Sequence, residues 1–420
     1  MKVCVIGNGG REHALAWRLS ISPSVTKVYA IPGSAAMSDC AELVGIDWQQ
    51  SDHLIRFLKD NHVDLVVVGP EAPLVAGLAD ALNVAGIPVF GPSKAAAQLE
   101  GSKVFAKDLM KKYNIPTAAY GVFHKVDEAK EFIAQTGAPI VVKADGLAAG
   151  KGVVVAMTVE EANAAVEDML SGNRFGEAGS TVVIEEFMDG EEASLLAFVD
   201  GKTVVPMIAS QDHKRIFDGD KGPNTGGMGT YAPAPVLTDA LRDEAMKTIL
   251  EPMVAAMQKE GMPYVGCLYA GLMITPQGPK VVEFNARFGD PETQVVLPLL
   301  DSDLGQIMMA CATGTLTADI VKWKDSSAAC VILASKGYPE TSSKGDVIHG
   351  DIKQHDTTIV FHSGTKLVGE EYVTNGGRVL GVVGLGKDLR TALDRAYGRI
   401  EHIDFEGMQY RTDIGAKAFK

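Results

Sequence analysis

The sequence has no long apolar segment. Among its 420 residues, no uninterrupted apolar run approaches the roughly 18–20 residues that a membrane-spanning helix needs. Near the N-terminus, Val3–Ile6 is a four-residue apolar run that ends at Gly7. The core of a signal peptide needs about 7–15 apolar residues, so this run is better explained as a buried strand. We therefore expect neither a membrane span nor a secretory signal.

Cysteine is scarce, and its positions show no metal-binding spacing. The five cysteines are scattered and mostly lie within apolar runs. An odd number of scattered cysteines is typical of small buried side chains in a reducing compartment. We therefore expect free thiols and a cytoplasmic protein. The five are Cys4, Cys40, Cys267, Cys311 and Cys330.

Positive charge is in deficit, with 39 Lys and Arg against 53 Asp and Glu, a formal net charge of -14. This balance argues against broad binding to nucleic acid or to membrane surfaces, because both are polyanions. It does not exclude a small anionic substrate, since a local cluster of basic side chains and backbone N–H groups can hold a phosphate. With 46% apolar and 22% charged residues, the composition is that of a soluble globular protein. Its length predicts roughly two to four domains.

The first hundred residues alternate strand and helix signals. Apolar, mostly β-branched runs at Val3–Ile6, Val25–Ile31, Val63–Val68 and Ile87–Phe90 are separated by helical segments, and several end in glycine turns. This rhythm predicts a parallel sheet covered by helices on both faces. In such sheets ligands bind beyond the carboxyl ends of the strands. We predict an N-terminal α/β domain over residues 1–101.

A helix predicted over Ser102–Tyr113 opens the next part of the chain, and the following Pro116 prevents its continuation. Strands and helices then mix over residues 102–325, which predicts a central α+β domain. Residues 326–420 are predicted to form a small α+β unit with few chemical signals. The main predicted elements of the two parts are strands at 139–144, 153–156, 181–184, 265–274, 280–285, 328–334, 357–361 and 379–383, two strands within 194–209, and helices at 127–136, 158–170, 238–260 and 388–401.

A glycine turn, Gly7-Asn8-Gly9-Gly10, follows the first strand and precedes a helix. Glycine allows close approach of the backbone, and helix N–H groups favour anions, so this turn is suited to a phosphate. A dinucleotide fingerprint would require a third glycine where the chain has Glu12, and an acidic residue at the end of the second strand, which Val28–Ile31 does not provide. A monophosphate site and a tight turn without ligand both remain open, whereas nicotinamide binding is a remote alternative.

A second glycine-rich segment follows Lys143. Gly146 and Gly150 are separated by three residues rather than four, Gly152 stands where a P-loop has Ser or Thr, and the apolar run after it predicts a strand instead of a helix. The segment is therefore predicted to be a flexible hairpin loop. A lysine charge on an apolar strand is costly unless it is paired. Strand alternation could turn Lys143 outward, but we favour a triphosphate as its partner.

The stretch Val281–Arg287 combines metal-ligand chemistry with a cation. On a strand of period two, Glu283, Asn285 and Arg287 share one face, and Val282, Phe284 and Ala286 share the other, which is predicted to pack in the core. Carboxylate and amide oxygens suit Mg²⁺, which also leaves positions for substrate phosphates. Arg287 beside them is suited to a carboxylate or a developing phosphoryl charge. A surface strand with a polar face is the simpler alternative.

Together with Val183–Glu192, the Lys143–Gly152 segment resembles the ATP-grasp superfamily. The resemblance implies that two α+β halves hold ATP under a glycine lid, with a lid subdomain at about 117–190, behind a Rossmann-like N-terminal domain. It implies that Lys103 and Lys143 contact the phosphates, that the backbone near Glu186–Met188 contacts adenine, and that Glu192 contacts the ribose. Without the resemblance, 185–192 would be a strand end with a solvated acidic turn. The implied ATP-binding residues are Lys103, Lys143, Gly146, Gly150, Lys151, Gly152, Glu185, Glu186, Phe187, Met188 and Glu192.

The same resemblance implies a metal and a catalytic arginine. Glu283 and Asn285 match the ligands of Mg²⁺ (or Mn²⁺), and Arg287 matches the arginine that stabilises the phosphoryl group, with Lys143 as its catalytic partner. Many ATP-grasp enzymes add an acidic residue from the preceding strand, but Tyr264–Ile274 contains none. The ligands of a second metal therefore remain open.

Further motifs resemble the phosphoribosylamine–glycine ligases in order and spacing over essentially the whole chain. They are Gly7–His13, Gly69–Leu74, Gln211–Arg215, the anion cradle predicted at Gly222–Gly229, and Arg287–Glu292. The resemblance implies that ATP, glycine and 5-phosphoribosylamine give glycinamide ribonucleotide, ADP and phosphate through a glycyl phosphate, in purine biosynthesis. The candidate substrate-binding residues are Gly9, Gly10, Glu71, Asp212, His213, Lys214, Gly226, Gly227, Asp290 and Glu292.

Three alternatives remain at this stage. The first is another ATP-grasp ligase or a carboxylase, the second a nicotinamide-dependent oxidoreductase, and the third a non-catalytic ATP-binding regulator. For His213 we favour a hydrogen-bonding role over that of a general base, because a neutral amine is already nucleophilic. We expect a monomer or weak dimer that binds neither nucleic acid nor membranes.

Overall fold

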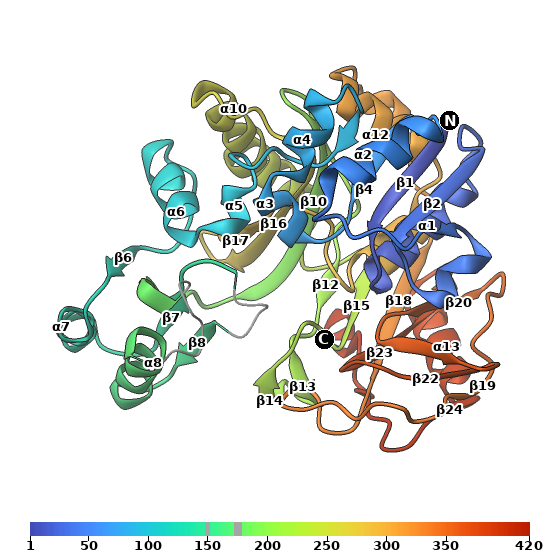
Figure 1. Cartoon of the computed structure of the whole chain (residues 1–420). Coiled ribbons are helices and arrows are strands. Elements are labelled where there is room, and N and C mark those ends of the chain that lie inside the picture. The colour runs from blue at the N-terminus through green and yellow to red at the C-terminus, as the bar shows by residue number, and fades with distance from the viewer. Residues whose placement is uncertain (148–151, 172–178) are drawn as a thin grey trace.

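The N-terminal part is a parallel sheet covered by helices, as the sequence predicts. A computed structural model describes residues 1–147, 152–171 and 179–420 (Figure 1). The sheet has the order β3-β2-β1-β4-β5, and all neighbouring strands are parallel. Cys4 and Ile6 of β1 pack into one hydrophobic core and Val3 and Val5 into another, so both faces are covered. The elements are β1 (Lys2–Gly7), α1 (Gly10–Ser20), β2 (Lys27–Pro32), β3 (Glu42–Leu43), α2 (Ser51–Asp60), β4 (Leu65–Val68), α3 (Glu71–Ala76), α4 (Leu78–Val84) and β5 (Val89–Phe90).

A small subdomain with its own core stands apart from the rest of the molecule, attached through the chain around α6 (Figure 1). Its antiparallel sheet has the order β6-β9-β7-β8, with two helices packed on it. Its hydrophobic core includes apolar side chains from both helices and from β7 and β9. Its elements, with the preceding helices, are α5 (Gln98–Gly101), α6 (Lys103–Lys112), β6 (Tyr120–Phe123), α7 (Val126–Thr136), β7 (Ile140–Ala144), β8 (Val153–Ala156), α8 (Val159–Ser171) and β9 (Val182–Glu186).

The central sheet has the order β11-β10-β16-β17. It lies between the N-terminal sheet and the small subdomain (Figure 1). The helix predicted over 238–260 is present, but Met246–Leu250 forms a π-helical turn within it. The helical segments pack with β10 and β16 into one hydrophobic core that also includes one face of the N-terminal sheet. The elements are β10 (Glu191–Asp200), β11 (Val204–Pro206), α9 (Asp239–Ala245), α10 (Glu251–Lys259), β16 (Val265–Thr275), β17 (Gly278–Asn285), α11 (Thr293–Val296) and α12 (Leu304–Thr313).

The C-terminal sheet takes two strands from the central part of the chain. Its order is β12-β15-β18-β23-β20, and both β12 and β15 precede residue 325 (Figure 1). The C-terminal unit therefore shares its sheet with residues 211–232. The elements are β12 (Gln211–Asp212), β13 (Arg215–Phe217), β14 (Lys221–Asn224), β15 (Gly229–Ala232), β18 (Ser327–Ala334), β19 (His349–Gly350), β20 (Thr358–His362), β21 (Thr365–Val368), β22 (Glu371–Thr374), β23 (Arg378–Gly386), α13 (Leu389–Ile400) and β24 (Ile403–Asp404).

Two further expectations concern cysteines and membranes. All five cysteines are free thiols, and four of them are buried, as predicted. Within the described ranges, no helix combines the length and the apolar character that crossing a bilayer would require.

Strand β17 departs from the predicted alternation. Gly271 pairs with Glu283 but Leu272 pairs with Val281, so Val282 is an extra residue in a β-bulge. The prediction that Val282 lies on the core face with Phe284 is therefore wrong, and Val282 lines the cleft described below. The strand also ends at Asn285, two residues before Arg287.

A close contact between backbones joins the N-terminal and central sheets. Gly266 of β16 has φ +121°, and a Cβ placed on it would lie 3.0 Å from Cα of Gly91, which follows β5. Gly261 also has a positive φ, +76°, but a Cβ there would meet no atom within 4 Å.

We expect Gly266→Ala to lower the thermal unfolding midpoint more than Gly261→Ala does. A positive φ alone costs an alanine about 1–2 kcal/mol, and crowding the Gly91 backbone adds about 1–3 kcal/mol. Thermal unfolding of the two variants measures the difference. An equal drop of the unfolding midpoint in both variants would show that the close approach of Gly266 to Gly91 adds nothing to the cost of the substitution.

Candidate active site

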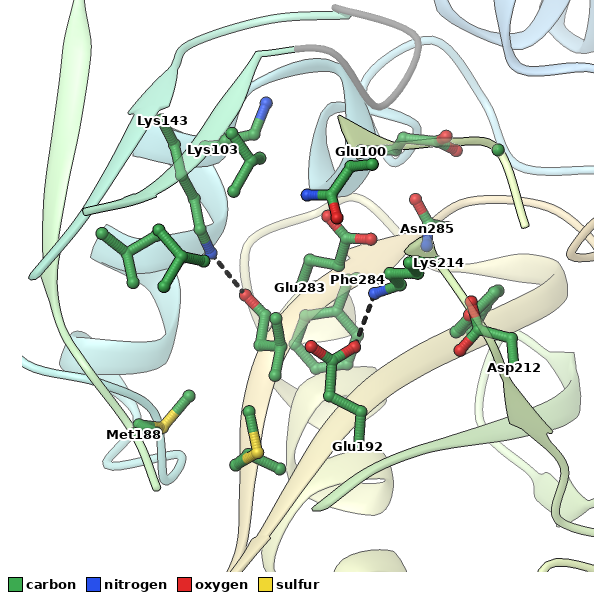
Figure 2. A pocket seen from close by; sticks show the side chains of 18 of the residues that line it. Glu100, Lys103, Lys143, Met188, Glu192, Asp212, Lys214, Glu283, Phe284 and Asn285 are labelled. Atoms are coloured by element: carbon green, nitrogen blue, oxygen red, sulfur yellow. Dashed lines mark hydrogen bonds and ion pairs between the residues drawn. The ribbon is translucent and has the colours of Figure 1, made fainter. Parts of the chain in front are cut away.

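A large cleft lies between the small subdomain, the central sheet and the loops that lead into the C-terminal sheet. Its volume is about 680 Å³. Lys143 of β7 and Glu283 of β17 line it from opposite sides (Figure 2), so the two segments that the sequence singled out face one cavity. The predicted residues that line the cleft are Glu71, Lys103, Lys143, Gly146, Glu185, Glu186, Phe187, Met188, Glu192, Asp212, His213, Lys214, Gly226, Glu283, Asn285, Arg287, Asp290 and Glu292.

Other predicted residues lie elsewhere. Gly150 and Lys151 fall outside the described residues, and Gly152, which is described, does not line the cleft. Neither do Gly9 and Gly10. The backbone N–H of Gly9 donates to Oε2 of Glu12 at 2.7 Å, so a carboxylate of the chain already occupies this helix N-terminus.

The predicted anion cradle at 222–229 differs from the structure. Residues Lys221–Asn224 form β14, which pairs with β13 in a two-stranded ribbon. The N–H of Gly226 donates to Oη of Tyr338 at 3.0 Å, and the N–H of Gly227 donates to Oγ1 of Thr225 at 2.9 Å. Gly227 does not line the cleft. The N–H groups of these two glycines are therefore already paired within the protein, and a role of Gly226 and Gly227 in binding a phosphate stays a prediction.

Lys143 is paired within the protein. Its Nζ donates to Oε2 of Glu185 at 3.0 Å and to the carbonyl oxygen of Val282 at 3.1 Å. Since its side chain is only 5% exposed, the alternative that strand alternation turns it to solvent is wrong. Lys107 lies 3.1 Å from the same Glu185 oxygen. Two ammonium groups thus share one carboxylate, which leaves one positive charge in excess at the cleft.

Lys107 is a residue that our sequence reasoning missed. It follows Lys103 by one turn of α6, and this i, i+4 spacing is the signal that could have found it. Its Nζ donates to Oγ1 of Thr117 at 2.8 Å, and it is 2% exposed. Burial, together with the charge of Lys143, lowers the pKa of Lys107 to about 8, although Glu185 opposes this shift.

Lys103 lies at the first position of α6. Its Nζ donates to the carbonyl oxygen of Gly146 at 3.0 Å, and its backbone N–H donates to Oδ1 of Asp145 at 2.6 Å. Asp145 also accepts from the N–H of Val104 at 3.2 Å, so a side chain after β7 caps α6. The hydrogen bond to Gly146 joins the Lys103 ammonium to the residues that follow β7.

Glu283 and Asn285 present oxygens to the cleft from β17 (Figure 2). Burial alone would raise the pKa of Glu283, but Lys214, Lys143 and Lys103 lower it below its ordinary value. Among the described residues, no group of three His, Cys, Asp or Glu side chains could hold a metal ion. A carboxylate and an amide fit an Mg²⁺ ion that takes its other ligands from phosphates and water.

Arg287 is held by two carboxylates. Its Nη2 donates to Oε1 of Glu100 at 2.7 Å, and its Nε lies 3.3 Å from Oε2 of Glu71. Oε2 of Glu100 also accepts from the N–H of Ala286 at 2.8 Å. Burial would lower the pKa of Arg287, but Glu100 and Glu71 raise it, so the side chain stays charged. Sequence reasoning missed Glu100, which has no motif of its own.

Acidic groups gather at the opposite end of the cleft. Burial raises the pKa of Asp212 to about 7, and Glu292 and Glu192 add to this shift while Lys214 opposes it. Glu192 forms an ion pair with Lys214 at 2.6 Å (Figure 2), and Oε1 of Glu292 accepts from Oη of Tyr269 at 2.5 Å. This end of the cleft suits a cationic group such as an ammonium ion.

His213 has both ring nitrogens engaged. Nδ1 lies 3.3 Å from the carbonyl oxygen of Gly229, and the N–H of Gly415 donates to Nε2 at 3.3 Å. Burial, and the charges of Arg411 and Lys417, lower the pKa of His213 to about 4. The geometry agrees with the predicted hydrogen-bonding role.

The sheet of the small subdomain and the central sheet thus enclose one cleft that carries buried lysines, a carboxylate–amide pair that could hold a metal, and an arginine held by two carboxylates. This combination of fold and site defines an ATP-grasp enzyme.

Comparison with known proteins gives the family. Models of phosphoribosylglycinamide synthetase match the chain in three parts, the N domain at residues 1–100, the ATP-grasp (A) domain at 101–293 and the C domain at 328–417. The phosphoribosylamine–glycine ligase of Halalkalibacterium halodurans is 53% identical over 418 residues, which cover 100% of this chain and 97% of the relative. That of Vibrio cholerae is 51% identical over 422 residues, covering 100% and 98%. The chain belongs to the phosphoribosylamine–glycine ligase family.

Solved structures agree with this assignment. The crystal structure of phosphoribosylamine–glycine ligase from Thermotoga maritima has a TM-score of 0.87 and 34% identity, covering 99% of this chain and 100% of that chain. The biotin carboxylase domain of the Hydrogenobacter thermophilus 2-oxoglutarate carboxylase has a TM-score of 0.75 but 17% identity, covering 97% and 91%. The second likeness shows a common fold alone.

We expect Lys107→Met to raise the KM for ATP by on the order of tenfold at pH 7, because it removes the excess positive charge near the phosphates. In the unchanged protein, the same KM should rise from pH 7 to pH 9, as Lys107 loses its proton near a pKa of about 8. The variant should lack this rise. Steady-state kinetics across this pH range measure the KM for ATP of the two proteins. The control is Lys111→Met, which replaces an exposed lysine of α6. An unchanged KM in Lys107→Met would contradict the charge argument.

Proposed function

We propose that this protein joins glycine to 5-phosphoribosylamine with ATP, giving glycinamide ribonucleotide, ADP and phosphate in purine biosynthesis. The observation that carries the proposal is the placement of Lys143 and Glu283 on facing walls of one cleft, in a chain whose family members are named for this ligation. We further propose a cytoplasmic enzyme that is a monomer or weak dimer.

In the first step, a carboxylate oxygen of glycine attacks the γ-phosphorus of ATP. The bond from that phosphorus to the bridging oxygen breaks, and ADP leaves with its electron pair. Lys103 and Lys143 hold the phosphates, and the excess charge of the Lys143–Glu185–Lys107 cluster offsets their negative charge. Glu283 and Asn285 would hold Mg²⁺, which neutralises phosphate charge when bound.

In the second step, the sugar amine attacks the carbonyl carbon of glycyl phosphate. The carbon–oxygen bond to phosphate breaks, phosphate leaves, and the nitrogen loses a proton to water. Glu100 and Glu71 hold Arg287 in place. The positive charge of its guanidinium stabilises the negatively charged acyl phosphate. A general base is not required, since the neutral amine is nucleophilic. Positioning and electrostatics carry the catalysis.

The acidic end of the cleft supports the placement of glycine. Asp212 and Glu292 lie where they can receive its ammonium group, and Asp290, Glu71 and Lys214 are proposed for the sugar. Gly9, Gly10, Gly226 and Gly227 stay predictions for the 5-phosphate.

ADP release should require glycine and phosphoribosylamine together, with the amine generated in situ and one substrate omitted at a time. Lys143→Ala and Glu283→Ala should each lower the rate by about 10²–10³-fold, the usual loss for a group that stabilises transition-state charge. Lys125→Ala, an exposed lysine of the same subdomain, is the control. ADP release that bicarbonate stimulates and glycine does not would identify a carboxylase instead.

The KM for glycine should fall about tenfold between pH 6 and pH 8, because the Asp212 carboxyl ionises near a pKa of about 7 and then attracts the ammonium. A raised pKa means that the charged form is present only above this pH. Asp212→Asn should have a high KM for glycine that does not change over this range. A fall of the same size in the asparagine variant would assign the titration to another group.

A further inference from the structure

The C-terminal domain contacts both backbone polar groups of Gly226. Oη of Tyr338 accepts from the N–H of Gly226 at 3.0 Å, and Nη1 of Arg378 donates to its carbonyl oxygen at 2.9 Å. A Cβ placed on Gly226 would lie 2.9 Å from Cζ of Arg378, so the guanidinium packs directly against the glycine. Two side chains from the C-terminal domain thus hold the peptide groups on either side of the Gly226 Cα.

Arg378 also holds a second loop. Its Nη1 donates to the carbonyl oxygen of Asp290 at 2.8 Å, and its Nη2 lies 3.6 Å from Oδ2 of the same residue. Asp290 is further held by Nε2 of Gln294, which donates to its Oδ1 at 2.8 Å. This loop continues to Glu292 at the acidic end of the cleft.

Arg378 is positively charged, so it can keep its contacts with both loops. Burial would lower its pKa, but Asp290 raises it, so Arg378 stays charged. Its side chain is 21% exposed and lines the cleft. The C-terminal domain, which carries few chemical signals in the sequence, therefore contributes an arginine that joins two substrate-facing loops.

We propose that Arg378 and Tyr338 are positioning residues for the end of the cleft that binds the sugar amine. They act through the 225–228 and 289–292 loops, which present Gly226 and Asp290 to that end of the cleft. Lys103 and Lys143 make their described contacts with other partners, so the ATP end is independent of this clamp. The inference rests on the proposed function.

Arg378→Met should lower kcat/KM for phosphoribosylamine by on the order of 100-fold, as expected when reacting groups are misplaced by about 1 Å. The KM for ATP should stay within about twofold. Arg378→Lys, which keeps the charge and one donor, should recover part of the loss. Tyr338→Phe should give an intermediate loss. The control is Arg395→Met, which removes another arginine of this domain that donates to a backbone carbonyl, that of Leu385.

Thermal shift completes the test. The product, glycinamide ribonucleotide, carries the same ribose phosphate and should stabilise the unchanged protein but not Arg378→Met, while ATP stabilises both. If Arg378→Met loses stabilisation by ATP and by the product equally, the defect is a general structural one and the proposal is overturned. Unchanged kinetics in Arg378→Met would also overturn it. If the unchanged protein neither makes nor binds the product, the proposed function fails, whereas loss in the variants alone supports the clamp.

Discussion

The site depends on burying charge in pairs. Lys143 and Lys107 both bind the Glu185 carboxylate, and all three side chains are at most 5% exposed. Burying either ammonium group without a carboxylate would be costly, because desolvation penalises the charged form. Glu185 offsets this cost for both lysines. The same cluster joins α6 to β7 and β9, so it links the small subdomain to the rest of the molecule.

The charges near the end of β17 are also buried with partners of opposite sign. Arg287 is flanked by Glu100 and Glu71, and Arg11 lies 4.0 Å from Glu71 and 2.6 Å from Glu12. These charges alternate in sign from the N-terminal helix to the end of β17. Burial would raise the pKa of Glu71, but Arg287 and Arg11 lower it below its ordinary value. Residues of the N-terminal domain thus hold the Arg287 guanidinium in place.

The third domain contributes structure rather than reactive groups. Strands β12 and β15 carry the chain from the cleft into the C-terminal sheet, where β15 pairs with β18. Asp212 and His213 stand at the edge of this sheet, and Gly415 of the C-terminal segment donates to His213. The acidic end of the cleft is thus a product of the sheet that the two parts share.

The sequence by itself determined the parallel N-terminal sheet and the chemistry of Glu283, Asn285 and Arg287, because periodicity and residue type are local properties. It also identified Lys143, since a lysine on an apolar strand needs a partner. Only the tertiary structure decided that the partner is Glu185, that Val282 forms a bulge, and which residues hold the loops. Arg287 and Glu100 are 187 positions apart, and Arg378 and Gly226 are 152 apart. Such pairs are set by how sheets and loops pack, which no local pattern encodes.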